Sequence, residues 1–114
     1  MKILTLQIKR EFLDQILSGE KKQEFREIRP KNAKKYVEQS EEDLKPVKYD
    51  AIQFYNGYAK NRPEVLIQVK KSDVELFEYE DGELITYEED GQQYIEAQVV
   101  YTLGKIISKN NMSF

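Results

Sequence analysis

Two cations near the start of the chain, Lys21 and Arg26, are placed so that both could bind an anion, and Gly19 and Glu24 lie in the same short stretch. A lysine ammonium is a compact charge that can reach a phosphate or a carbonyl, and a guanidinium can grip phosphate through two parallel hydrogen bonds. If residues 22–28 form a strand, Glu24 and Arg26 share one face, with Cα atoms about 6.6 Å apart. Arg26 can then hold Glu24 in place and still offer donors to a ligand. The alternative is a solvated edge, an exposed Glu–Arg pair worth about 0–1 kcal/mol of stability.

The chain lacks two residue types that often take part in catalysis, and this limits the reactions that it could catalyse. It contains no cysteine, so no disulfide or thiolate is available, and no histidine, the commonest general base and metal ligand near neutral pH. Catalysis would have to come from carboxylates, lysine, tyrosine or bound water. The acidic stretches do not have the spacing of a calcium loop, and we expect neither a metal nor a cofactor.

A second stretch, FYNGYAKNRP at residues 54–63, interleaves aromatic and basic side chains. Its candidate ligand-binding residues are Tyr55, Asn56, Tyr58, Lys60 and Arg62. Single-stranded nucleic acid is held by aromatic platforms with basic groups beside them, at about 1–3 kcal/mol per stacked base. The alternative is that the tyrosines cap the fold and the charges only solubilise the loop. If this loop folds against the first stretch, a nucleic-acid ligand is favoured.

Charge is distributed unevenly along the chain, whose net charge is −3 and whose isoelectric point is about 5.1. Residues 20–35 hold seven Lys or Arg against three Glu, whereas residues 73–96 hold ten Asp or Glu and no Lys or Arg. A protein that binds duplex DNA must neutralise many phosphates and is usually basic. We therefore expect no extended surface for duplex DNA, and any nucleic-acid contact to be a local pocket. The acidic segment is interpreted as solvated surface, with a protein-interaction surface as a further possibility.

Hydrophobic periodicity predicts the strands and helices that hold these residues in place. Residues 2–8 alternate as a first strand, and residues 10–18 place apolar side chains on one helical face. Gly19 follows at the usual stop position of a helix. Residues 22–28 alternate as a second strand, and Pro30 suits the first turn of a second helix.

In the second half of the chain, alternating apolar residues and Asp-Gly pairs predict strands joined by tight turns. Strands are expected at residues 49–55, 64–77, 84–87 and 93–103. Asp81-Gly82 and Asp90-Gly91 each predict a hairpin turn. Strands joined in this way pair mostly antiparallel, and a chain this short closes them most economically into a small curved barrel. We predict a single α+β domain over residues 1–114, with two or so helices flanking the strands.

The order of these motifs resembles the ASCH domain family, a branch of the PUA-like β-barrels. Residues 19–26 fit the family pattern Gly-x-Lys-x-x-Glu-x-Arg, between a short amphipathic helix and a strand. The segments ILSGEKK, IQFYNGY and TLGKII follow in the family's order, so the resemblance spans nearly the whole chain. It implies a small, mostly antiparallel PUA-like β-barrel with a cleft at the pattern, and RNA or a nucleotide-like molecule as the ligand.

Under this binding hypothesis, Lys21 and Arg26 contact phosphate or carbonyl oxygens of the ligand. Glu24 accepts a hydrogen bond from a base edge or orders Arg26. Tyr55 or Tyr58 stacks on a base. Gly19 has a structural role, because it lets the backbone turn from helix to strand.

An enzyme is the alternative that the same resemblance implies. Some ASCH-like proteins are amidohydrolases acting on acetylated cytidine, and ribonuclease activity is known within the family. Lys21 stands at the matching lysine position, and a buried lysine can activate water or a hydroxyl. Those amidohydrolases carry threonines after the lysine, whereas this chain has Lys22 and Glu24, which departs from their pattern. Glu24 could instead act as a general base.

The opening residues MKILTLQIK are too interrupted for a signal peptide. No apolar run approaches the roughly 20 residues that a membrane-spanning helix needs. Together with the absence of cysteine, these features lead us to expect a soluble, cytoplasmic protein with no membrane partner.

Overall fold

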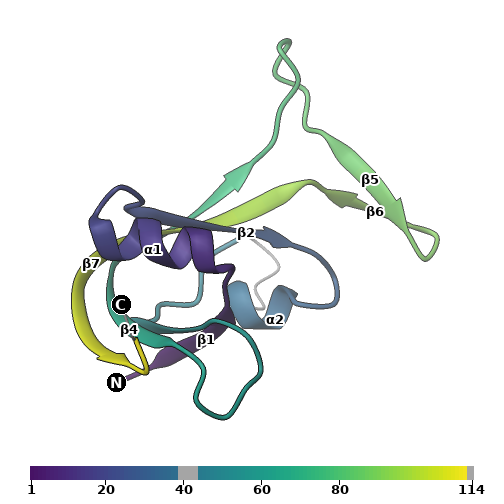
Figure 1. The fold of residues 1–114 in the computed structure, drawn as a ribbon. Coiled ribbons are helices and arrows are strands. Elements are labelled where there is room, and N and C mark those ends of the chain that lie inside the picture. The colour runs from purple at the N-terminus through teal and green to yellow at the C-terminus, as the bar shows by residue number, and fades with distance from the viewer. Residues whose placement is uncertain (39–43, 113–114) are drawn as a thin grey trace. The chain divides into compact units, whose positions relative to one another are not determined.

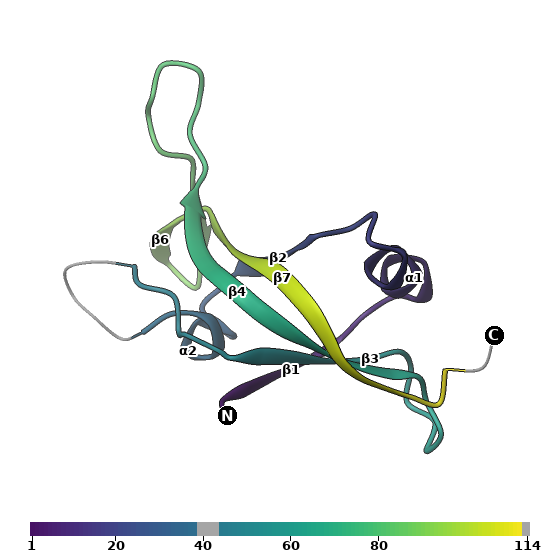
Figure 2. The same cartoon turned by 90° about the vertical axis from the view of Figure 1, so that its left-hand side faces the viewer.

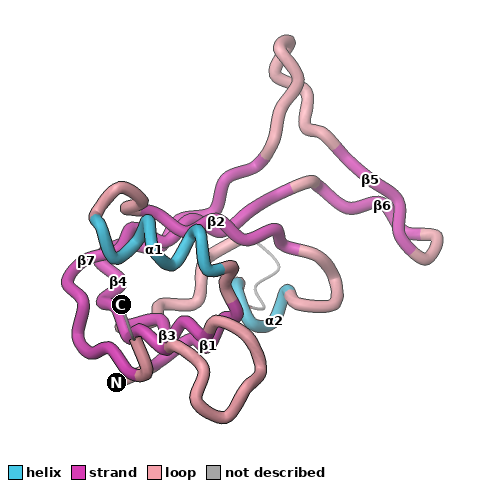
Figure 3. Tube along the Cα trace, in the orientation of Figure 1, coloured by secondary structure: helices cyan, strands magenta, loops and turns pink. Residues whose placement is uncertain are grey.

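The computed structural model describes residues 1–38 and 44–112, and confirms the expectation of a small α+β protein. Its elements are β1 (Ile3–Gln7), α1 (Arg10–Ser18), β2 (Gln23–Ile28), α2 (Ala33–Tyr36), β3 (Ala51–Tyr55), β4 (Glu64–Leu76), β5 (Thr86–Glu89), β6 (Gln92–Ile95) and β7 (Ala97–Asn110). Figure 1 shows them in chain order, and Figure 3 distinguishes helices, strands and loops. Within the described residues, no helix has both the length and the apolar character needed to span a membrane.

The chain folds as two compact units, each assembled from segments that are distant in the sequence. The first unit contains residues 1–24, 48–71 and the described residues from 101 onward. The second contains residues 72–100 and the described part of 25–47. Strands β2, β4 and β7 each begin in one unit and end in the other. A single domain over the whole chain stays a prediction.

The main sheet has the strand order β1-β3-β4-β7-β2, and β5 and β6 form a separate two-stranded sheet. β1 pairs in parallel with β3, from Ile3 opposite Ala51 to Gln7 opposite Tyr55, whereas β3 and β4 are antiparallel. The sheet is therefore mixed, because the long connection between β1 and β3 lets the chain return in the same direction. No closed barrel is found among the described strands, and barrel closure stays a prediction.

Alternating apolar residues of the strands form the core of the first unit. Its fully or almost fully buried side chains include Leu4, Leu6, Leu13, Ile16, Ile52, Phe54, Val65, Ile67 and Tyr101. The strand members recur at every second position, as expected for one face of a pleated sheet. Leu13 and Ile16 belong to α1, so burial of its apolar side anchors this helix to the unit.

Helix α1 has the bounds that the apolar spacing predicts. It ends at Gly19, whose φ of 83° is a left-handed conformation that glycine adopts without a steric cost. The Gly19 N–H donates to the Ile16 carbonyl (3.2 Å), and the Lys21 N–H donates to the Gln15 carbonyl (3.0 Å). These bonds satisfy two carbonyls of the helix end and fix the position of Lys21 beside it.

The strand predicted over residues 93–103 is divided at Glu96. The Glu96 N–H donates to the Ile85 carbonyl (2.8 Å), and the Glu96 carbonyl accepts from the Phe77 N–H (3.0 Å). The backbone thus changes partner at this residue, so β6 ends and β7 begins. β7 then continues to Asn110, beyond the predicted end.

The predicted hairpin turn at Asp90-Gly91 is confirmed between β5 and β6. Both residues have positive φ, at 51° and 80°, as the favoured two-residue hairpin turns require. On the flanking strands, the rings of Tyr87 and Tyr94 stack with centroids 5.6 Å apart. The Arg29 guanidinium lies 4.1 Å from the Tyr87 ring centroid, so β5 also has a contact with the residue that follows β2.

Candidate functional site

The Lys21 ammonium and the Glu24 carboxylate form a largely buried ion pair where the chain enters β2. Lys21 Nζ lies 3.2 Å from Glu24 Oε1, and the two side chains are 18% and 7% exposed. The ammonium also lies 5.7 Å from the centroid of the Phe12 ring of α1. A carboxylate removed from water is costly unless it is paired. Lys21 supplies such a partner for Glu24, and the pair fixes the direction of the lysine side chain.

A hollow of about 570 Å³ is bounded by the C-terminal end of α1, the turn that follows it, and strands β4 and β7. Its lining residues are Ile16, Leu17, Ser18, Gly19, Lys21, Lys22, Ile67, Gln68, Lys70, Leu103, Gly104, Lys105 and Ile106. The Leu103 N–H donates to the Lys22 carbonyl (2.9 Å), which ties the turn to β7. The volume lies in the range of small-molecule sites. We call this site the lysine hollow.

The described residues lining the lysine hollow include four lysines and no acidic residue. Lys22, Lys70 and Lys105 are exposed, and none of the three has an ion pair with a carboxylate in the described part of the chain. Their charges are therefore available to a bound anion. The isoleucines and leucines of the lining add an apolar surface that suits a sugar or a base.

Gly104 allows two side chains of β4 to lie across β7 inside the lysine hollow. A Cβ at position 104 would lie 2.3 Å from Gln68 Oε1 and 2.8 Å from Lys70 Cγ. Gln68 Oε1 accepts a hydrogen bond from the Lys105 N–H (3.3 Å). The amide nitrogen of Gln68 is then the group that can donate to a ligand. The hollow thus combines cations with the neutral amide donor of Gln68.

Arg26 lies two residues beyond Glu24 on β2, where the side chains alternate as predicted. Glu24 and Ile28 are buried and Arg26 is half-buried, so these residues share the inward face of the strand. Arg26 belongs to the second unit and is not among the lining residues of the lysine hollow. The structure therefore joins Lys21 to Glu24, and a contact between Arg26 and the ligand stays a prediction.

The loop between β3 and β4, drawn in pink in Figure 3, contributes no residue to the lining of the lysine hollow. The Arg62 guanidinium lies 3.9 Å from the centroid of the Tyr55 ring. The Asn56 amide donates to the Ile8 carbonyl (2.9 Å). Three of the predicted ligand-binding residues, Tyr55, Asn56 and Arg62, are thus engaged in contacts that order the loop.

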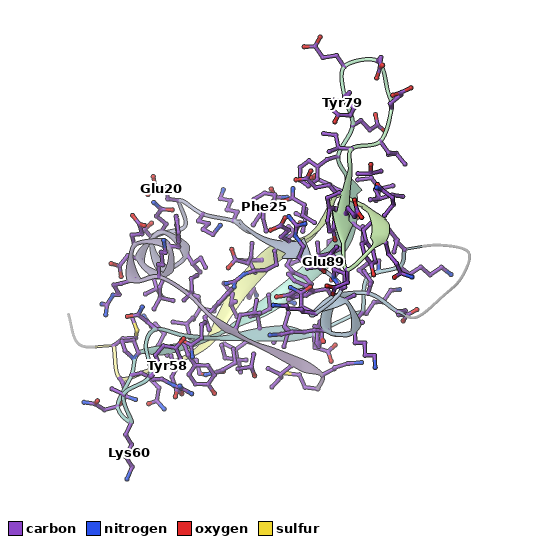
Figure 4. All side chains as sticks on the ribbon, turned by 90° about the vertical axis from the view of Figure 1, so that its right-hand side faces the viewer. Glu20, Phe25, Tyr58, Lys60, Tyr79 and Glu89 are labelled. Atoms are coloured by element: carbon purple, nitrogen blue, oxygen red, sulfur yellow. The ribbon has the colours of Figure 1, made fainter. Side chains whose placement is uncertain are left out.

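Tyr58 and Lys60 are the exposed members of the same loop. Tyr58 is 87% exposed, and Lys60 is exposed as well. Figure 4 shows both at the opposite side of the first unit from Glu20, the neighbour of Lys21 in the turn beside the lysine hollow. Within the described residues of the first unit, the loop is therefore not folded against the turn that carries Lys21.

Besides Lys22, the residues of the lysine hollow that were not predicted from the sequence include Gln68, Lys70, Gly104 and Lys105. These four lie on β4 and β7, which are side by side in Figure 2 and adjacent in the strand order. One feature of the sequence, Gly104, could have indicated this part of the hollow. Gly104 interrupts an alternating strand, and a glycine in that position marks a close approach of other atoms.

Comparison of the chain with models of known families, with curated proteins and with solved structures gives no match. Membership of the ASCH domain family therefore stays a prediction from the motifs. The function has to be argued from the lysine hollow and from the ion pair beside it.

Proposed function

We propose that this chain is an RNA- or nucleotide-binding domain of the ASCH type, and that the lysine hollow holds a phosphate with its sugar or base. The observation that carries the proposal is the convergence of Lys21, Lys22, Lys70 and Lys105 on one hollow without an acidic lining residue. This convergence is the more telling because the whole chain has a net charge of −3. The PUA-like barrel is part of the same proposal.

The lining of the lysine hollow suits the two chemical parts of a nucleotide. Lysine ammonium groups bind phosphate through charge, which supplies affinity without reading sequence. The apolar lining suits the sugar or the face of a base. The Gln68 amide can donate to a base carbonyl, which supplies preference. Glu24 is buried and paired with Lys21, so we assign it to positioning Lys21 rather than to contacting the ligand.

Titration of short single-stranded RNA and of a nucleoside monophosphate panel at low salt tests this proposal. The double variant Lys70→Gln, Lys105→Gln removes two exposed charges, and we expect the affinity to fall about tenfold or more. Each lost phosphate contact also reduces the slope of log K against log salt by about 0.7 for a single strand. Lys60→Gln is the matched control, because this exposed lysine lies outside the hollow.

Two results would overturn the proposal. The first is binding weaker than millimolar for every RNA and nucleotide probe. The second is a loss of affinity per removed charge that is the same in Lys60→Gln and in the double variant, which would show that only overall charge matters.

The buried Lys21–Glu24 pair supports a second candidate, a small hydrolase acting on a modified nucleoside such as acetylcytidine or on RNA. In amide hydrolysis, water adds to the acetyl carbonyl carbon, the C–N bond breaks, and a proton passes to the leaving amine. Glu24 would accept the proton from water, and Lys21, 3.2 Å away, would stabilise the charge that develops on oxygen. Incubation with acetylcytidine, with Lys21→Ala in parallel, separates this candidate from simple binding. Unchanged substrate with the protein in excess excludes it.

A further inference from the structure

The lysine hollow has a neighbour in the first unit. A second hollow of about 580 Å³ is lined by Met1, Asp50, Gln68, Val69, Lys105 and Ile107. Gln68 and Lys105 line both hollows, so the two adjoin along β4 and β7. Each has the volume of a separate small-molecule site. We call the second one the adjoining hollow.

We propose, building on the function proposed above, that the ligand is a single-stranded oligonucleotide whose consecutive nucleotides occupy the two hollows, with the linking phosphate at Lys105. A mononucleotide would use only part of this surface. The shared position of Lys105 places one cation at the boundary, where a strand passing from one hollow to the other carries its linking phosphate.

The two hollows differ in chemistry, and the difference fixes which part of the strand each holds. The lysine hollow has four lysines and no acidic residue, which suits a phosphate. The adjoining hollow has the apolar side chains of Met1, Val69 and Ile107 beside the Asp50 carboxylate. Apolar side chains favour the face of a base, whereas a carboxylate repels a phosphate. The adjoining hollow therefore holds a base.

The carboxylate of Asp50 also indicates which bases are preferred. Asp50 Oδ2 accepts a hydrogen bond from the Lys2 backbone N–H (2.7 Å), which fixes the orientation of the carboxylate. The other oxygen can accept from the exocyclic amine of cytosine or adenine. Uracil presents a carbonyl at the corresponding position and would leave the carboxylate without a donor. We therefore expect cytidine to be preferred over uridine at this position.

Calorimetric titration at low salt compares cytidine 5′-monophosphate, the 5′-phosphorylated dinucleotides of cytidine and of uridine, and inorganic phosphate. Occupation of two hollows predicts that the cytidine dinucleotide binds about tenfold or more tightly than the monophosphate. It should also bind more tightly than the uridine dinucleotide, by about fivefold or more.

Variants of the adjoining hollow then locate the second nucleotide. Ile107→Ser and Asp50→Asn should reduce the affinity for the cytidine dinucleotide several-fold and reduce that for the monophosphate by a smaller factor. Asparagine keeps an acceptor for the Lys2 N–H, so this local contact is retained. Ile95→Ser is the matched control, because Ile95 is similarly exposed (39% against 48% for Ile107) and lines neither hollow.

Equal affinities for the cytidine monophosphate and dinucleotide would overturn the two-hollow inference while leaving the proposed function intact. The same holds if Ile107→Ser weakens both ligands equally, or if inorganic phosphate binds as tightly as the dinucleotide. The absence of binding by every nucleotide would overturn the inference and the proposed function together.

Discussion

The lysine hollow and the loop between β3 and β4 both gather cationic residues in the first unit, but they use the cations differently. In the loop, Arg62 stacks on Tyr55 within the same short segment, and its Nε lies 4.0 Å from Glu64 Oε1. In the hollow, Lys22, Lys70 and Lys105 come from three separated segments and have no ion pair with a described carboxylate. A dense group of charged residues in a sequence therefore need not be the group that is available to a ligand.

The loop needs its own contacts because it closes with few backbone bonds. The Asn56 N–H donates to the Pro63 carbonyl (3.0 Å), and the Arg62 N–H donates to the Ala59 carbonyl (3.1 Å). The side chain of Asn111 donates to the Arg62 carbonyl (3.1 Å). The hollow lies on paired strands and a capped helix end, where the backbone is already satisfied. The exposed lysines Lys22, Lys70 and Lys105 are therefore not needed to hold the chain in place.

The largest expected effect on stability concerns Lys21, the lysine of the hollow that forms an ion pair with Glu24. Glu24→Ala leaves the partly buried Lys21 ammonium without this carboxylate, and we expect the free energy of unfolding to fall by about 2–3 kcal/mol. Urea denaturation measures this loss. Glu20→Ala is the matched control, because this glutamate is exposed, and it should change stability by less than about 0.5 kcal/mol. Similar values for the two variants would mean that the Lys21–Glu24 pair is energetically an ordinary surface pair.

The variant Gly104→Ala tests whether Gln68 and Lys70 of the lysine hollow contact the ligand. The new Cβ displaces the far end of Gln68 and shifts Lys70, so we expect oligonucleotide affinity to fall about tenfold. The stability should change by no more than about 1 kcal/mol, because the displaced groups are exposed side chains. The other four glycines all have positive φ, so none of them offers a matched control. Unchanged affinity would show that Gln68 and Lys70 do not contact the ligand.

Arg62→Ala tests whether the loop is structural. Loss of the stack on Tyr55 should lower the free energy of unfolding by about 1 kcal/mol, with oligonucleotide affinity within about twofold of the unchanged chain. Lys60→Ala, in the same loop but exposed, should alter neither quantity. A large loss of affinity in Arg62→Ala or Tyr58→Ala would reverse the comparison and assign the binding surface to the loop.

The smallest effect is a pH dependence of the stability that comes from Tyr49, whose ring packs edge-on against Tyr101 in the first unit. Burial raises the pKa of the Tyr49 phenol above its ordinary value of 10.0. The neutral phenol is therefore favoured in the folded state, so its contribution is complete below about pH 10 and is lost as the pH rises through the raised pKa. The difference in unfolding free energy between the unchanged chain and Tyr49→Phe should shrink in that alkaline range.

Local chemistry made several elements predictable. The bounds of α1 and its end at Gly19 follow from apolar spacing and from the conformational freedom of glycine. The alternation of β2 and the Asp90-Gly91 turn follow in the same way, because each depends on neighbours within a few residues. The contact between Lys21 and Glu24 was also within reach, since the two are only three residues apart.

Long-range pairing was not predictable in this way. The parallel pairing of β1 with β3 and the change of partner at Glu96 depend on hydrogen bonds between distant segments. The approach of Gln68 to Gly104 depends on β4 and β7 lying side by side. No periodicity within either strand contains that information.

Helix α1, its end at Gly19, the alternation of β2 and the charged pattern from Gly19 to Arg26 could be inferred from the sequence, because short-range sterics and side-chain periodicity act within a few residues. Which cations share a hollow depends instead on how distant segments fold together. Lys70 and Lys105 reach Lys21 and Lys22 through the strand order of the sheet, and that order is selected by the burial of apolar faces that are far apart along the chain.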